Sequence, residues 1–206
     1  MTLTEQFPDA HCELIHRNPF ELAVAVVLSA QATDVSVNKV TPALFEKYPT
    51  PALMAEASLP EIEEKIRTIG LYRNKAKSIS ALSKRLVEEF HGEMPRTMEE
   101  LLTLPGVGRK SANVILSVCF DVPAIAVDTH VERISKRLGL ARKNDDVFTV
   151  EKKLMRKIPK EKWSHAHHLF IFFGRYFCKA KNPQCDDCKL QDLCKEKNKN
   201  LKKTSA

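Results

Sequence analysis

Apolar residues recur at helical spacing along most of the chain, and no long segment alternates polar with apolar residues as a half-buried strand would. The clearest series consists of Ala76, Ile79, Leu82, Leu86 and Phe90. Steps of three or four residues place these side chains on one stripe of an amphipathic helix. The segment 19–30, PFELAVAVVLSA, is apolar on nearly all sides and predicts a buried helix. The pattern therefore predicts an all-α protein.

Helix starts are marked by a capping residue that is followed by proline or by glutamate. Starts of this kind are Asn18-Pro19, Thr41-Pro42, Thr50-Pro51, Ser58-Leu59-Pro60-Glu61, Thr97-Met98-Glu99-Glu100 and Thr129-His130-Val131-Glu132. Asp145 or Asp146 begins a further helix, and residues 163–177 form the last long one. The segment Ile69-Gly70-Leu71-Tyr72 predicts a break between two helices.

The composition limits the class of protein. The 206 residues, 43% of them hydrophobic, suffice for one or two domains with a proper core. The chain contains no run of 18 apolar residues and no apolar signal region at its N-terminus, so we expect a cytoplasmic protein that spans no membrane. The 33 Lys and Arg residues exceed the 26 Asp and Glu residues, for a net charge of +7. This balance suits a polyanionic partner, although the lysine-rich C-terminus alone could produce it.

A glycine-rich turn, Leu104-Pro105-Gly106-Val107-Gly108, precedes an amphipathic helical segment. Its two glycines can adopt positive φ and leave backbone N–H groups uncovered. Together with the unpaired N–H groups and the positive dipole end of the next helix, these donors form an anion site. The turn lacks the spacing of a nucleotide-binding P-loop. We therefore expect Gly106, Val107 and Gly108 to bind a single phosphate.

Lys110 lies in the first turn of that helix, and Asp128 follows a second loop that contains Pro123. A helix N-terminus and a dry cleft both disfavour the ammonium form of a lysine, whereas a nearby carboxylate favours it. If the first two effects dominate, Lys110 becomes a nucleophile at neutral pH. Alternatively, Lys110 pairs with a phosphate and Asp128 caps a helix. The spacing alone does not decide between these roles.

Four cysteines near the C-terminus have the spacing C-x6-C-x2-C-x5-C, namely Cys178, Cys185, Cys188 and Cys194. Thiolates packed so closely in a reducing compartment require a metal centre to neutralise them. Zinc and a [4Fe–4S] cluster both accept four sulfurs, and the spacing leaves both open. A tail of this size also needs such a centre in order to fold.

The segment LPGVGRKSANV, followed by VPAIAVDTH, resembles the helix-hairpin-helix and Gly/Pro-Asp signature of the endonuclease III family of DNA glycosylases. The resemblance extends over nearly the whole chain, through LSAQATD, IGLYRNKA and the cysteine spacing. Two positions depart from the family pattern: Asp121, where glycine is usual, and Ser111, where threonine is common. Neither departure removes a catalytic group.

The resemblance implies a bifunctional DNA glycosylase and abasic-site lyase of base excision repair that removes oxidised pyrimidines. Lys110 would attack C1′ of the extruded nucleotide, form a Schiff base and allow β-elimination 3′ to the lesion, while Asp128 assists. The resemblance also favours a [4Fe–4S] cluster over zinc. The expected partner is double-stranded DNA with a damaged pyrimidine or an abasic site, bound by a monomer that associates with the nucleoid if the source is bacterial.

Four further residues are expected to contact DNA. Gln31 and Leu71 are similar to the residues with which the family invades the duplex, Leu71 as an apolar wedge and Gln31 as a partner for the orphaned base. Without the resemblance, Leu71 would be assigned to the core and Gln31 to a helix end. His130 and Lys181 are expected to contact phosphates.

The same resemblance implies two helical domains with a DNA-binding cleft between them. Residues 12–122 would form one domain, with the helix-hairpin-helix motif at about 98–117. Residues 1–11 and 123–206 would form the second, which carries the cysteines. The hairpin and Lys110 would then lie at the interdomain cleft, where sites commonly form.

Two other functions compete with this interpretation. A monofunctional relative, such as a mismatch adenine glycosylase, usually lacks the lysine and has an extra C-terminal domain, so Lys110 and the end at Ala206 argue against it. A non-catalytic helix-hairpin-helix module would bind DNA without needing Lys110 and Asp128. Nicking of abasic DNA separates that module from the enzyme.

Overall fold

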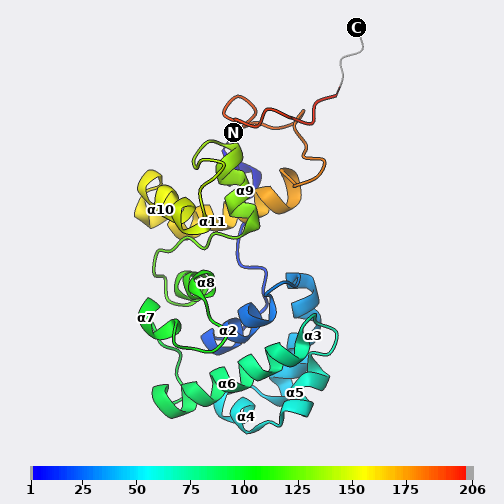
Figure 1. Cartoon of the computed structure of the whole chain (residues 1–206), viewed down its shortest axis with the longest axis vertical. Helices are drawn as coiled ribbons and strands as arrows, with labels where there is room; N and C mark the ends of the chain where they lie inside the picture. Colours follow the sequence, from blue (N-terminus) through cyan, green and yellow to red (C-terminus); the bar gives the residue numbers. More distant parts are fainter. Residues whose placement is uncertain (1, 203–206) are drawn as a thin grey trace. The chain divides into compact units, whose positions relative to one another are not determined.

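The computed structural model describes residues 2–202, which form helices joined by loops and include no β-strand (Figure 1). The helices are α1 (Leu3–Gln6), α2 (Pro19–Leu28), α3 (Asp34–Lys47), α4 (Pro51–Glu56), α5 (Leu59–Lys65), α6 (Tyr72–Phe90), α7 (Met98–Leu101), α8 (Arg109–Cys119), α9 (Thr129–Arg137), α10 (Val147–Lys157), η1 (Lys160–Lys162), α11 (Trp163–Phe172) and η2 (Phe173–Phe177). The all-α class is thus confirmed. Within residues 2–202, none of the helices has the length and apolar character needed to cross a membrane.

The chain divides into two compact units. The hairpin unit comprises Cys12–Val122. The cysteine unit comprises the N-terminal residues up to His11 together with the chain from Pro123 onward. Each unit has a hydrophobic core of its own, so the local packing of each can be described separately.

Helix α2 supplies the centre of the hairpin unit. Every residue from Phe20 to Leu28 is buried, as the continuous apolar run predicts. Helices α6 and α8 pack against α2, and α4 and α5 pack against α6 (Figure 1). The predicted stripe of α6 is buried from Ala76 to Leu86, and Phe90 is partly buried at its end. The core forms because each amphipathic helix must bury its apolar stripe against another element.

The capping residues set most helix starts as predicted. The caps confirmed by a side-chain hydrogen bond from a backbone N–H of the first turn are Asn18, Thr50, Thr97 and Asp146. Ser58 and Glu61 form the predicted capping box of α5. These contacts satisfy N–H groups that have no partner inside the helix, which explains why local sequence signals find them.

One predicted start is wrong. No helix begins at Thr41-Pro42, because α3 starts at Asp34, is capped by Thr33 and continues through Pro42. One face of α3 is buried on both sides of the proline, at Val37, Val40, Thr41, Leu44 and Phe45. Burial of this continuous face outweighs the single backbone hydrogen bond that proline removes.

The cysteine unit is built from α9, α10 and α11 around a second core that includes Phe170 and Phe173. The N-terminal segment joins this core through Phe7, whose ring lies edge-on to that of Phe173 with centroids 6.4 Å apart. The predicted last helix is continuous over 163–177 but changes from α to π geometry at Phe173. Its final hydrogen bond, from Cys178 N to Phe173 O, spans five residues and brings Cys178 to the helix end.

Candidate functional site

The glycine-rich turn joins α7 to α8 and packs closely on two other helices. Gly106 has φ +81°, a conformation that favours glycine. A Cβ atom at Gly106 would lie 3.1 Å from both Ser78 Cβ of α6 and Val27 Cγ1 of α2. Val107, the next residue, is buried. Backbone conformation and packing together hold the turn in place ahead of α8.

Gly108 is the N-cap of α8 and has φ −97°. The prediction of positive φ therefore holds for Gly106 and is wrong for Gly108. Among residues 2–202, nothing except its chain neighbours lies within 4 Å of the position of a Cβ atom at Gly108. Helix α8 has no side-chain cap and no acidic residue in its first turn. The first N–H groups of a helix have no partner within the helix itself, and together with the open space beside the glycine they suit an anion such as a phosphate.

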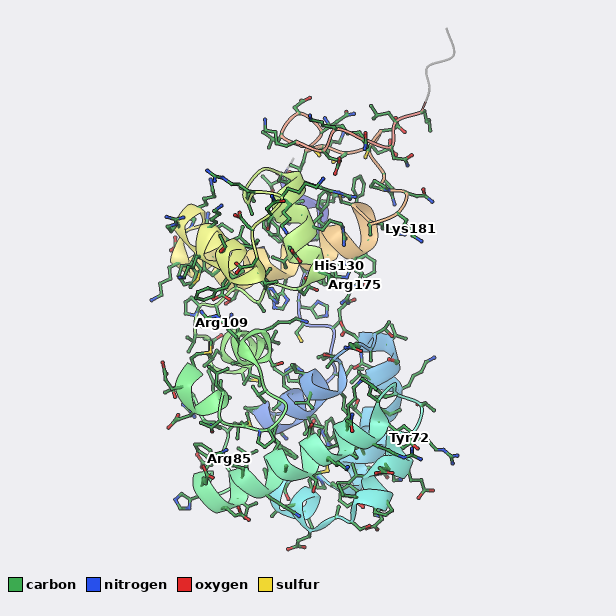
Figure 2. All side chains as sticks on the ribbon, viewed as in Figure 1. Tyr72, Arg85, Arg109, His130, Arg175 and Lys181 are labelled. Carbon is green, nitrogen blue, oxygen red and sulfur yellow. The ribbon has the colours of Figure 1, made fainter. Side chains whose placement is uncertain are left out.

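Lys110 is the second residue of α8, and its side chain is exposed. Arg109, labelled in Figure 2, precedes it. Two cations therefore lie at the positive end of the helix dipole. This pair increases the attraction of the helix end for an anionic ligand. Arg109 was not among the residues predicted from the sequence, although its position next to Lys110 is a visible signal.

Asp128 is half-buried and caps α9 in the cysteine unit. Its Oδ1 accepts hydrogen bonds from the backbone N–H groups of His130 at 2.9 Å and Val131 at 2.8 Å. The predicted capping box that starts at Thr129 is wrong, because Asp128 takes the cap position and Thr129 is the first helical residue. The capping role is therefore present in the structure, and it orients the carboxylate for any second role.

His130 is half-buried in the first turn of α9, beside Arg175 of η2 (Figure 2). Its Nδ1 lies 3.2 Å from Nη2 of Arg133. Burial, together with the charges of Arg133 and Arg175, holds the pKa of His130 below its usual value, although Asp128 acts in the opposite direction. A phosphate would therefore meet a ring biased toward its neutral form and two neighbouring guanidinium groups, neither of which was predicted from the sequence.

Gln31 and Leu71 share an unusual backbone conformation, with φ of 54° and 59°. Both side chains are exposed, and Leu71 has 58% of its surface accessible. The assignment of Leu71 to the core is therefore wrong, whereas Gln31 does follow the end of α2. A left-handed conformation costs a leucine about 1–2 kcal/mol, so Leu71 is held outward at a cost in stability.

The four spaced cysteines face one cavity in the cysteine unit. Its lining includes Cys178, Cys185, Cys188 and Cys194, and none of them forms a disulfide. Burial raises the pKa of the Cys178 and Cys188 thiols, so the protein alone does not favour their thiolates. Bound metal would supply the missing positive charge and bind them deprotonated.

The arrangement of the sulfurs also bears on the kind of metal. No group of three or more His, Cys, Asp or Glu side chains within residues 2–202 is placed to hold a single metal ion. A zinc ion would require all its ligands to converge to about 2.3 Å from one point. A [4Fe–4S] cluster offers each cysteine its own iron, so four thiols around one cavity fit it better.

Two arginines of α9, neither of them predicted from the sequence, bind the chain beside the first cysteine. Arg133 donates to the carbonyl oxygen of Cys178 at 3.2 Å and to that of Gly174 at 2.6 Å. Arg137 donates to Lys179 O at 2.8 Å and contacts Cys178 Sγ at 3.2 Å. More than 40 residues separate the arginines from these partners, so no local motif could reveal them.

The cysteine unit also has a basic groove of about 840 Å³, whose charged lining residues are Glu132, Arg133, Lys136, Arg137, Lys143, Lys195, Glu196 and Lys197. Part of this charge is neutralised internally, since Lys136 pairs with Glu132 at 2.6 Å. Lys181, the predicted phosphate contact, is exposed in the loop after Cys178 (Figure 2). The excess of cations suits the phosphates of a nucleic acid.

The predicted site residues thus fall into two sets. Those of the hairpin unit are Gln31, Leu71, Gly106, Val107, Gly108 and Lys110. Those of the cysteine unit are Asp128, His130, Lys181, Cys178, Cys185, Cys188 and Cys194. The hairpin unit therefore has the cations Arg109 and Lys110 at its glycine turn. The cysteine unit has a basic groove and the four cysteines.

Comparisons with known proteins agree with these features. Residues 24–160 match the model of the HhH-GPD superfamily base excision DNA repair protein, and residues 178–194 match the iron–sulfur binding domain of endonuclease III. Endonuclease III of Bacillus subtilis (strain 168) is 60% identical over 97% of this chain and 91% of its own. Endonuclease III of Escherichia coli (strain K12) is 46% identical over 96% and 93%. A solved structure of a trapped endonuclease III–DNA covalent intermediate is 62% identical, with a TM-score of 0.92 over 94% of this chain and 91% of that one.

These matches decide between the two metal centres, because the iron–sulfur model spans all four spaced cysteines. The four cysteines hold a [4Fe–4S] cluster, which cross-links the C-terminal tail. Both family models and the full-length relatives point to one family, and the chain accordingly belongs to the endonuclease III family and is a DNA glycosylase and abasic-site lyase of base excision repair.

Proposed function

We propose that the chain removes oxidised pyrimidines from double-stranded DNA through a Schiff base at Lys110, and that it acts as a monomer. The main support is the exposed amine of Lys110 at an uncapped helix N-terminus, directly after a turn with room for a phosphate. The phosphate would hold the DNA strand beside the amine. A relative that is 62% identical has been captured as a covalent intermediate with DNA, which supports covalent catalysis in this chain.

In this mechanism Nζ of Lys110 attacks C1′ of the damaged nucleotide, and the bond from C1′ to the base breaks. The base leaves with a proton, and the sugar ring opens to a Schiff base. Loss of a proton from C2′ then breaks the bond from C3′ to the 3′ phosphate, which cuts the strand 3′ to the lesion. Water finally hydrolyses the imine and restores the lysine. The covalent route divides one difficult displacement into easier steps.

We assign Asp128 to the same reaction, as a carboxylate that accepts a proton from Lys110 or stabilises positive charge on the sugar. Its Oδ1 is oriented by two backbone N–H groups, which supports a positioned rather than a mobile carboxylate.

Gln31 and Leu71 are assigned to the opened duplex, supported by their exposed positions at helix ends. The division into two compact units supports separate domains of residues 12–122 and of residues 1–11 with 123–206. DNA binding would associate the protein with the nucleoid in a bacterium.

Borohydride trapping on single-lesion duplexes tests the proposal. The wild-type protein should form a reduced covalent adduct at Lys110 with DNA that contains an oxidised pyrimidine or an abasic site. Lys110→Gln keeps a polar tip of similar reach but has no nucleophilic amine, so trapping and strand cleavage should both vanish. DNA binding should survive within about a few fold, because the hairpin backbone still holds the phosphate.

Two variants serve as controls for charge. Lys110→Arg keeps the cation but presents a guanidinium that stays protonated, so it should also fail to trap. Arg109→Gln removes the neighbouring cation and should weaken binding while retaining trapping. A Lys110→Gln protein that still traps and nicks would identify another amine as the nucleophile. Base release without any trapping by the wild-type protein would favour a monofunctional mechanism.

A further inference from the structure

Arg137, at the end of α9, contacts the cluster-binding tail at both of its ends. Its Nη1 lies 3.2 Å from Cys178 Sγ and 2.8 Å from Lys179 O, next to the first cysteine. Its own carbonyl oxygen accepts a hydrogen bond from Lys195 N at 2.7 Å, directly after the last cysteine. The side chain of Arg137 is only 16% exposed, so these contacts are made in a partly dry environment.

We propose that Arg137 is a positioning residue for the iron–sulfur cluster and sets its reduction potential through the N–H···S hydrogen bond to Cys178. A donor that points at a ligand sulfur withdraws electron density from the bond between sulfur and iron. The more reduced cluster, which carries more negative charge, is thereby stabilised, and the reduction potential rises. This role concerns the cluster alone and does not depend on the assignment of Lys110.

A purely mechanical role for Arg137 must be separated from this electronic one, because Arg137 also clamps backbone carbonyl groups. Arg133 offers the matched comparison. Both guanidinium groups contact Cys178 O, at 3.2 Å for Arg133 and 3.4 Å for Arg137. Only Arg137 also contacts the sulfur of that residue. Replacing either arginine removes one positive charge and its hydrogen bonds to backbone carbonyl oxygens. Of the two replacements, only that of Arg137 also removes the hydrogen bond to Cys178 Sγ.

The experiment compares the iron-loaded wild-type protein with Arg137→Met, Arg137→Lys and Arg133→Met. Protein-film voltammetry without DNA should show a more negative potential in Arg137→Met than in Arg133→Met. Resonance Raman spectra should show an upward shift of the Fe–Sγ stretch in Arg137→Met and little shift in Arg133→Met. Arg137→Lys, which keeps the charge and can donate to one acceptor, should fall between Arg137→Met and wild type. Cluster loss to a chelator should accelerate about tenfold in Arg137→Met, a typical effect of losing a partner of a metal ligand.

Equal potentials and equal Raman spectra for Arg137→Met and Arg133→Met would overturn the proposal. The loss of charge and of hydrogen bonds to backbone carbonyl oxygens would then account for the effects of both substitutions. If Arg137→Met fails to retain iron, Arg137→Lys decides the question. A potential and Fe–Sγ stretch in Arg137→Lys that match wild type would then refute a role for the guanidinium hydrogen bond. A negative shift with normal iron content would support it.

Discussion

Oδ1 of Asp128 lies 2.8 Å from the backbone nitrogen of Val131 and accepts its hydrogen bond at the first turn of α9. The same oxygen accepts from His130 N at 2.9 Å. The carboxylate assigned to catalysis is therefore also the N-cap of the helix whose last residue, Arg137, contacts Cys178 in the cluster-binding tail. Structural and catalytic contributions of this side chain can be separated, because an amide can replace a carboxylate as a cap but not as a base.

Asp128→Asn should retain stability and lose activity. The amide oxygen can still accept the two N–H groups, so the free energy of unfolding should change by only a few tenths of a kcal/mol. Base removal should slow by about 10²-fold or more, while some lyase activity on ready-made abasic sites remains. Asp128→Ala should lose the cap as well, at about 1 kcal/mol. Denaturant titration and single-turnover kinetics on both variants measure the two effects; unchanged base removal in Asp128→Asn would exclude Asp128 from the reaction.

Leu71 should contribute to duplex opening rather than to stability, because its side chain is exposed in a left-handed conformation. Leu71→Ala should fold normally and slow base removal from a fully paired duplex. The loss should shrink when the lesion lies in a mismatched or open site, where unstacking costs less. Leu71→Gly should show the same kinetic defect. Its free energy of unfolding should be about 1 kcal/mol higher, because glycine relieves the strain of the left-handed conformation.

Leu53→Ala is the matched control for Leu71, because Leu53 is another exposed leucine of the hairpin unit, at 45% accessibility. It should leave base removal unchanged on every substrate. Loss of activity in Leu71→Ala that is equal on paired and open sites, together with a large drop in stability, would show that Leu71 is not a wedge.

The two glycines of the hairpin should respond differently to alanine. Gly106→Ala introduces a Cβ atom 3.1 Å from Val27 and Ser78 at positive φ, so the protein should lose about 2 kcal/mol or more of stability. Gly108→Ala meets no such obstacle and should stay within about 1 kcal/mol of wild type. Gly108→Ala should nevertheless weaken DNA binding, because the added methyl group keeps the phosphate from the backbone, and its salt dependence should barely change. Thermal unfolding and binding titrations check both; normal binding by Gly108→Ala would place the phosphate elsewhere.

DNA affinity should fall steeply with salt, because binding to phosphates releases counterions. Lys181→Ala should reduce the slope of the logarithm of affinity against the logarithm of salt concentration by about one. Lys47→Ala is the control, since the charge of Lys47 is paired with Glu61 at 2.8 Å, and its slope should remain that of wild type. Fluorescence titrations at several salt concentrations measure these slopes. An affinity that does not depend on salt would contradict the role of the basic surface.

The sequence alone predicted most helices and located the two candidate centres, the Lys110 segment and the four cysteines. Caps such as Asn18 and the buried stripe of α6 depend on residues three or four positions apart, which a single sequence displays directly. Lys110 follows its glycine turn, and the four cysteines lie within 17 residues. Each candidate centre is therefore formed by residues of one continuous sequence motif. The choice of a [4Fe–4S] cluster over zinc needed the family resemblance, because the spacing admits both metals.

Tertiary structure decided the features that depend on residues far apart in the chain. Helix α3 passes through Pro42 because the core buries both sides of it, and this burial outweighs a local stop signal. Leu71 is exposed, although a leucine after a glycine predicts core. Arg137 reaches Cys178 across 41 residues of sequence. Such contacts stabilise the protein only when segments far apart in the sequence come together in the fold. They therefore produce no periodicity or spacing in the sequence from which they could be predicted.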